Sequence, residues 1–252
     1  MHFSFASHHR HRSNSCSLAR HPVNPAHSAV AESPVFREIA ALRYEVYCQE
    51  RGYLDPRHYP EKVEIDEFDE RSTHIAAHTN DNLLVGTVRL VQAARQQAFP
   101  LEAHCSFFSD FDLPPREQCG EVSRLVVRQS FRGGGPSASM RPFVPERRRV
   151  LQAEQPPRTD CRRRSSSAQI LLGLYREMYH HSRAAGIRYW IAAMEKPLAR
   201  ALNMMGFQFA PVGPEADYSG PVTPFVADLD ELMADLSRAN PTLSAWFAAK
   251  PT

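Results

Sequence analysis

The sequence contains no long apolar run, few signs of covalent cross-linking and little net charge. No stretch approaches the roughly 18 consecutive apolar residues that a membrane-spanning helix requires, and the N-terminus lacks the apolar core of a secretory signal. The five cysteines are odd in number and include no C-x-x-C pair, which fits a reducing compartment. A net charge of +2 gives no general attraction to nucleic acid. We therefore expect a soluble, cytoplasmic protein without a transmembrane segment or a nucleic-acid partner.

The composition nevertheless supports a folded domain, preceded by a tail of different character. Hydrophobic residues make up 42% of the chain, enough for a substantial core. Residues 1–34 instead carry six of the twelve histidines and show no apolar period. We expect a disordered tail there, with a His-rich metal site as the alternative reading. Residues 35–252 are assigned to one domain.

One interior stretch of this domain differs from its surroundings. Residues 136–167 are rich in Pro, Arg and Ser, and eight arginines stand against three acids between positions 141 and 164. Such a composition predicts an inserted, mobile loop. The loop is either a solvated linker or a surface that attracts an acidic partner.

Elsewhere the hydrophobic pattern alternates between helix and strand. Apolar residues at helical spacing begin at Phe36, and Arg43 falls on the same face as they do. Residues 73–79 and 83–92 predict two strands joined by a turn, with Arg89 on an apolar strand face. Further segments with clear periodicity predict a helix over 168–186, a strand over 187–194, a short helix after Pro197, strands over 207–212 and 222–227, and a helical region over 228–247. The fold class is α/β.

Charged residues recur inside these apolar elements. One group has the spacing E-x-D-x-x-D, and another is an E-x-x-R that opens a β-branched strand. Buried charges are costly unless they pair, so we expect them to share one polar pocket. Glu121 and Arg124 are three residues apart and would face opposite sides of a regular strand, so a shared pocket requires a β-bulge. The set comprises Arg43, Glu64, Asp66, Asp69, Arg89, Glu121 and Arg124.

This ordered set resembles the acyl-homoserine-lactone (autoinducer) synthases. The segment Ala41–Tyr53 is more similar to the opening helix of their relatives, the PEP-CTERM/exosortase system-associated acyltransferases, or N-acyl amino acid synthases. The resemblance runs from about Phe36 to the C-terminus, apart from the stretch near 136–167. It implies a GNAT fold with a mixed, splayed central sheet, and a fatty acyl transfer from an acyl carrier protein or coenzyme A thioester to a small amine. It implies no permanently bound cofactor.

Acyl transfer to an amine gives each of these residues a candidate role. Glu121 is the expected general base, and the strand that follows it, with Val126 and Val127, offers backbone N–H groups to the thioester carbonyl. Asp66 and Asp69 could bind an ammonium group, while Arg43, Arg89 or Arg124 could bind a carboxylate. Phe107 and Phe108 belong to a Phe-rich stretch that is either core or the lining of an acyl pocket.

Several alternatives stay open at this point. An autoinducer synthase that uses S-adenosylmethionine and an ordinary acetyl-CoA-dependent N-acetyltransferase share the fold. The glycine loop 128–135 resembles the GNAT pyrophosphate loop but runs into Pro136 instead of a helix start. A non-catalytic module that binds acyl carrier protein is possible, as is a Cys119–His pair with His180 or His181. Glu121 could also form only a structural ion pair with Arg89 or Arg124. We expect no metal site, because E-x-D-x-x-D lacks the ligand order of a Ca²⁺ loop.

Overall fold

A computed structural model describes residues 33–132, 159–218 and 220–249, without the side chains of 159–166. In the described part of the chain, seven strands form one sheet in the order β1-β2-β3-β4-β7-β5, with β6 paired to β7. The main strands are β1 (Ser72–His78), β2 (Leu84–Gln92), β3 (Cys119–Val127), β4 (Tyr189–Met194) and β7 (Pro221–Asp228). Two short strands, β5 (Ala210–Pro211) and β6 (Ala216–Asp217), complete it.

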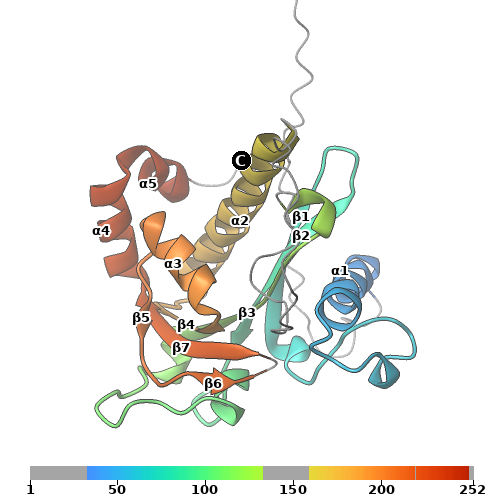
Figure 1. Cartoon of the computed structure of the whole chain (residues 1–252). Helices are drawn as coiled ribbons and strands as arrows, with labels where there is room; N and C mark the ends of the chain where they lie inside the picture. The colour runs from blue at the N-terminus through green and yellow to red at the C-terminus, as the bar shows by residue number, and fades with distance from the viewer. Residues whose placement is uncertain (1–32, 133–158, 219, 250–252) are drawn as a thin grey trace, which may run out of the picture.

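Helices lie on both faces of the sheet (Figure 1). Helix α1 (Pro34–Tyr44) lies on one side of β1–β3 and the long helix α2 (Thr159–Ala184) on the other. The main hydrophobic core forms beneath α2 together with α3 (Lys196–Met204), α4 (Leu229–Ala239) and α5 (Pro241–Ala248). A smaller apolar cluster lies under α1, and a third lies under the loop between β2 and β3. Short helical turns occur at Pro56–His58, Asp69–Arg71, Pro100–Ala103, Arg116–Gln118 and Gln129–Phe131.

The centre of the sheet opens into two diverging halves. Neighbouring strands are antiparallel except β3 and β4, which run parallel and pair at only three positions, the last being Glu121 with Ile191. Beyond that pair the two strands continue without pairing to each other. The prediction of an α/β fold with a mixed, splayed sheet is therefore confirmed.

Several predicted boundaries need correction. The helix expected over 168–186 begins at Thr159 and ends at Ala184. Residues 136–158 of the expected insertion and residues 1–32 of the expected tail lie outside the described residues. The 207–212 strand shrinks to Ala210–Pro211. Helix α1 continues into a π-helix, Glu45–Glu50, that the periodicity did not predict. None of the described helices is long and apolar enough to cross a membrane.

Candidate active site

Arg43 forms the innermost part of a charged network beneath α1. Its side chain lies at the C-terminal end of that helix, on the buried face, and is fully inaccessible to solvent. The guanidinium donates from Nε to Glu64, and from Nη1 and Nη2 to the two carboxylate oxygens of Asp69 at 2.8 and 3.2 Å. A buried arginine requires such partners, because an unpaired guanidinium would be strongly destabilising. Arg43 is thus positioned to hold the network together.

The acidic loop before β1 explains the E-x-D-x-x-D spacing. The backbone N–H of Asp66 donates to Asp69 at 2.9 Å, and the N–H of Phe68 donates to Asp66 at 3.0 Å. These bonds fold the loop into a turn that points both carboxylates toward β2 and β3. Burial acts to raise the pKa of Asp69, but the charges of Arg43 and Arg89 outweigh it and hold that pKa below its ordinary range. The same balance, with Arg43 and Arg124, lowers the pKa of Glu64. Both groups are carboxylates at neutral pH.

Arg89 connects this loop to the sheet. From β2 its Nη1 donates to Asp66 at 2.5 Å and to Asp69 at 2.9 Å, and its Nε donates to the hydroxyl of Ser123 on β3 at 3.0 Å. The side chain is only 1% exposed. Its Nη2 is buried and has no hydrogen-bond partner among the described residues.

A β-bulge in β3 brings Arg124 into the same network. Thr87 pairs with Val126 and Arg89 with Ser123, so two residues of β3 oppose one residue of β2. Arg124 takes up the extra residue with a left-handed φ of 52°, which is costly for a residue with a side chain. It donates to Glu64 at 3.0 Å and to Asp66 at 2.9 Å, and its guanidinium lies 5.5 Å from the ring centre of Tyr47. The bulge that the E-x-x-R spacing required is confirmed.

The network is balanced in charge and open at one point. Three arginines face three carboxylates, all buried except for Asp66 at 22% and Arg124 at 18% side-chain exposure. A small ligand can therefore reach one carboxylate and one guanidinium without displacing the rest. Of the predicted polar residues, the structure leaves Glu121 outside this network and brings the other six together, among them Glu64. That residue belonged to the acidic motif, and its complete burial between Arg43 and Arg124 could have been suspected from the need of two arginines for a further partner.

Glu121 lies apart from this network, at the point where the sheet begins to diverge. It is 2% exposed, and its Oε2 accepts a hydrogen bond from the backbone N–H of Leu101 at 2.9 Å. Burial raises its pKa to about 8, although the Leu101 hydrogen bond and the charges of Arg89 and Arg124 act in the opposite direction. Among the contacts of the described residues it forms no ion pair with either arginine. The purely structural ion pair considered from the sequence is therefore not formed.

The residues predicted to bind the acyl thioester do not form one surface. Val126 packs under α1, whereas Val127 packs against the core on the α2 side. Phe107 joins the apolar cluster beneath the β2–β3 loop, which also contains Leu101 and Ile191 and so adjoins Glu121. Phe108 is 45% exposed. The prediction treated neighbouring residues as equivalent, although adjacent strand residues face opposite sides. Only Val126 and Phe107 lie on the face that carries Glu121.

The thiol alternative is not supported by the geometry. Cys119 donates to the carbonyl of Pro114, and burial raises its pKa to about 12, so the thiolate is not populated at neutral pH. The nearby histidines are otherwise engaged, His180 with the carbonyl of Phe247 and His181 with the hydroxyl of Thr73. Within the described ranges, no cluster of three or more His, Cys, Asp or Glu residues is arranged to hold a metal ion.

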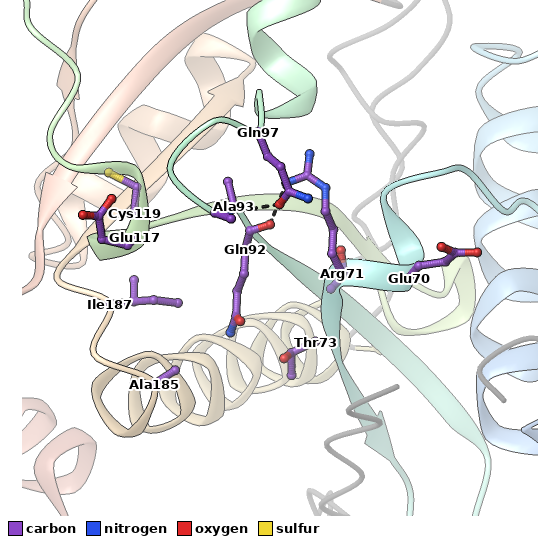
Figure 2. A pocket seen from close by; sticks show the side chains of 12 residues that line it. Glu70, Arg71, Thr73, Gln92, Ala93, Gln97, Glu117, Cys119, Ala185 and Ile187 are labelled. Atoms are coloured by element: carbon purple, nitrogen blue, oxygen red, sulfur yellow. Dashed lines mark hydrogen bonds between the residues drawn. The ribbon is translucent and has the colours of Figure 1, made fainter. Parts of the chain in front are cut away.

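One cavity among the described residues does not belong to this site. It has a volume of about 360 Å³ and lies where β1 and β3 begin, at the opposite end of the sheet from the divergence. Figure 2 shows Arg71 reaching across it toward Gln92, whose carbonyl accepts a hydrogen bond from Arg71 Nη1 at 2.6 Å. Neither Glu121 nor any member of the charged network lines it.

The comparison with known families agrees with this arrangement. Residues 42–140, which contain the charged network, Glu121 and the bulge, match the family described as "Acetyltransferase (GNAT) domain". The chain thus carries a GNAT domain, and the predicted fold and the prediction of an acyltransferase enzyme are confirmed at that level. No curated protein matches the sequence.

Solved structures with the same fold extend over most of the chain. TofI, in a ternary complex with an inhibitor and MTA, is 16% identical and covers 92% of this chain and 97% of its own, with a TM-score of 0.54. BjaI, a CoA-dependent acyl-homoserine lactone synthase with SAM and isopentyl-CoA, is 19% identical over 83% of this chain and 85% of its own, with a TM-score of 0.51. FeeM, an N-acyl amino acid synthase from uncultured soil microbes, is 12% identical over 83% of this chain and 94% of its own, with a TM-score of 0.51. At these identities the likeness is one of fold.

Proposed function

We propose that the protein is an N-acyltransferase that moves a fatty acyl group from an acyl carrier protein or coenzyme A thioester to the amine of an amino acid or related small amine. One observation carries the proposal. Glu121, a buried carboxyl whose pKa is raised by burial to about 8, shares a sheet face with a charge-balanced network whose two accessible members have opposite charges. A zwitterion presents the complementary pair of groups.

In the proposed reaction, Asp66 binds the ammonium group of the acceptor and Arg124 its carboxylate. Arg43, Asp69 and Arg89 fix these two side chains in place. Glu121, in its ionised form, removes a proton from the ammonium group, directly or through water, and so produces the nucleophilic amine.

The amine then attacks the thioester carbonyl carbon and forms a tetrahedral oxyanion. Backbone groups of β3 that no longer pair with β4 can stabilise that oxyanion. Collapse of the intermediate breaks the C–S bond and forms the amide. The thiolate leaves and takes up a proton, which requires little help because a thiol has a pKa near about 8.5.

Two finer features of the proposal depend on the sequence resemblance. The Ala41–Tyr53 opening is similar to the PEP-CTERM/exosortase-associated acyltransferases, which supports an N-acyl amino acid product. The arginine-rich sequence between 141 and 164 supports acyl carrier protein as the donor's carrier, through attraction of its acidic surface.

The test is mass spectrometry of lipid extracts from a bacterium that overproduces the protein, with the Glu121→Gln variant as the matched control. We expect N-acyl amino acids with a free carboxylate in the first extract and a strong reduction in the second. Acyl-homoserine lactone accompanied by release of methylthioadenosine would overturn the proposal in favour of an autoinducer synthase. Absence of any acylated product, with retained binding of acyl carrier protein, would indicate a non-catalytic module.

A further inference from the structure

Among the described residues, a hydrogen bond crosses the divergence between β3 and β4. The hydroxyl of Tyr53 donates to Oε1 of Glu195 at 3.0 Å, and the two residues are 142 positions apart in the sequence. Tyr53 follows the π-helix after α1, and Glu195 directly follows β4 and precedes α3. The contact therefore connects the α1 side of the domain to the far half of the sheet.

Both ends of this contact lie beyond the last paired position of the two strands. The last pair is Glu121 with Ile191, and Glu195 comes four residues after Ile191. On the other side, the backbone N–H of Tyr53 donates to the carbonyl of Tyr47, whose ring lies against Arg124, three residues after Glu121. At about 3.3 Å per strand residue, the contact lies roughly 10–13 Å from Glu121 along the diverging strands.

The contact also lies on the face that bears Glu121. Ile191 and Ala193 pack in the apolar cluster of that face, whereas Trp190, Ala192 and Met194 pack on the α2 side. Alternation places Glu195 with the first group, and Arg124 shares the same face through the bulge. A thioester arm that enters along the divergence toward Glu121 would have to pass beneath Tyr53.

The segment that carries Tyr53 joins an anchored π-helix to a glycine. Its N-terminal end is the π-helix, which two ion pairs hold to the end of β3, Arg128 with Glu45 and Arg132 with Glu50. Gly52, immediately before Tyr53, has a left-handed φ of 64°, and a Cβ there would meet no atom within 4 Å. Rotation at Gly52, with loss of the backbone hydrogen bond from Tyr53 to Tyr47, can thus swing Tyr53 away while the ion pairs keep the π-helix in place.

We propose that the Tyr53–Glu195 hydrogen bond is a latch that closes the approach to Glu121 and opens to admit the acyl thioester arm. The proposal rests on the function proposed above in taking a thioester as the ligand. The phenol is a constant donor at physiological pH, because burial and the charge of Glu195 raise the pKa of Tyr53 to about 12.

A latch makes a specific kinetic prediction, because donor binding must first break the contact. Removing only the hydroxyl, in Tyr53→Phe, should lower the donor KM by about five- to tenfold, since the open state becomes populated without that cost. At low donor concentration, thioester hydrolysis without acceptor should rise by the same factor. The acceptor KM should not change, because Asp66 and Arg124 are untouched.

The experiment compares Tyr53→Phe, Glu195→Gln and the double variant, with Tyr218→Phe as the control. Tyr218 instead stacks on the ring of His104, with ring centres 3.8 Å apart. An octanoyl-pantetheine thioester is the donor in the kinetic measurements. The corresponding thioether, which cannot be hydrolysed, is the ligand in the calorimetric binding measurements. We expect tighter thioether binding in both single variants, no further gain in the double variant, and none in Tyr218→Phe.

The outcomes separate this inference from the proposed function. Acyl transfer by the wild type with identical donor KM and thioether affinity in all variants would refute the latch alone. Thioether binding that tightens in Tyr53→Phe without any acyl transfer by the wild type would support the latch and refute the proposed reaction. If no variant binds the thioether, both ideas fail. A drop in kcat that follows lost thermal stability, with KM unchanged, would assign Tyr53 a purely structural role.

Discussion

Replacing Glu121 by glutamine should stabilise the protein while it abolishes most of the activity. In the folded state the carboxyl has a pKa of about 8, against 4.5 for an ordinary glutamate. Between these values the folded protein holds a proton that the unfolded chain releases, so stability is fully present below about pH 4.5 and is lost as the pH rises through 8. At about 1.4 kcal/mol for each pKa unit, the loss at pH 7 amounts to roughly 3 kcal/mol.

Glutamine removes this loss because it stays neutral at every pH. Its side-chain carbonyl can still accept the hydrogen bond that Oε2 receives from Leu101, although its NH₂ group requires an acceptor of its own. We therefore expect Glu121→Gln to be about 1–3 kcal/mol more stable than the wild type at pH 7 and nearly equal to it at pH 4.5. Urea denaturation at pH 4.5, 6, 7 and 8 measures the difference.

The activity should change in the opposite direction. Loss of a general base lowers transfer by about 10²–10⁴-fold. The wild type should show kcat/KM rising with pH through an apparent pKa near 8, as Glu121 becomes ionised, and the variant should lack that rise. Equal turnover in both proteins, or a variant that is less stable at every pH, would refute the reasoning. A misfolded variant cannot produce higher stability together with lower activity.

The remaining predictions concern the network and the donor. Asp66→Asn should raise the acceptor KM about 10- to 100-fold, because one charged hydrogen bond is lost, and should leave thioester hydrolysis in the absence of acceptor unchanged. Glu67→Gln, at an exposed neighbouring position, is the control. An equal effect in both variants would argue against Asp66 as the residue that binds the acceptor's ammonium group. Folding lowers the pKa values of Asp69 and Glu64, so these two carboxylates contribute stability that is present above about pH 4.5 and lost as the pH falls below it. The urea midpoint of the wild type should therefore decrease as the pH is lowered from 5 to 3. A midpoint that stays level over this range would contradict the buried ion pairs. Deleting residues 138–157 should raise the KM for acyl carrier protein and remove its salt dependence, without changing the KM for octanoyl-pantetheine; identical salt responses in both proteins would make the segment a passive linker.

The charged network shows how far the sequence could predict the site. The helical period placed Arg43 on the buried face, and the cost of burying charges predicted that it would meet the acidic loop. Spacing alone also predicted the bulge, because Glu121 and Arg124 could share a face in no other way. Local pattern was sufficient here because each inference depended on one element and one face.

Features that depend on contacts between distant elements could not be read in this way. Nothing in the sequence near Tyr53 indicates that its hydroxyl meets Glu195, because that contact depends on how far β3 and β4 diverge. The π-helix was missed because its apolar residues continue the helical spacing of α1. Val127 and Phe108 were assigned to the acyl site by proximity in sequence, although side-chain direction separates each from its neighbour.

The π-helix has a consequence for how this chain tolerates insertions and deletions. A π-turn holds one more residue than an α-turn, so deleting a residue between Glu45 and Glu50 would let α1 continue as a regular helix. An α-helix turns by about 100° per residue, however, so the same deletion would rotate everything downstream of it. Tyr47 would leave the guanidinium of Arg124, and Tyr53 would no longer face Glu195. Length in this segment should therefore vary little among functional variants, even where the identity of its residues changes freely.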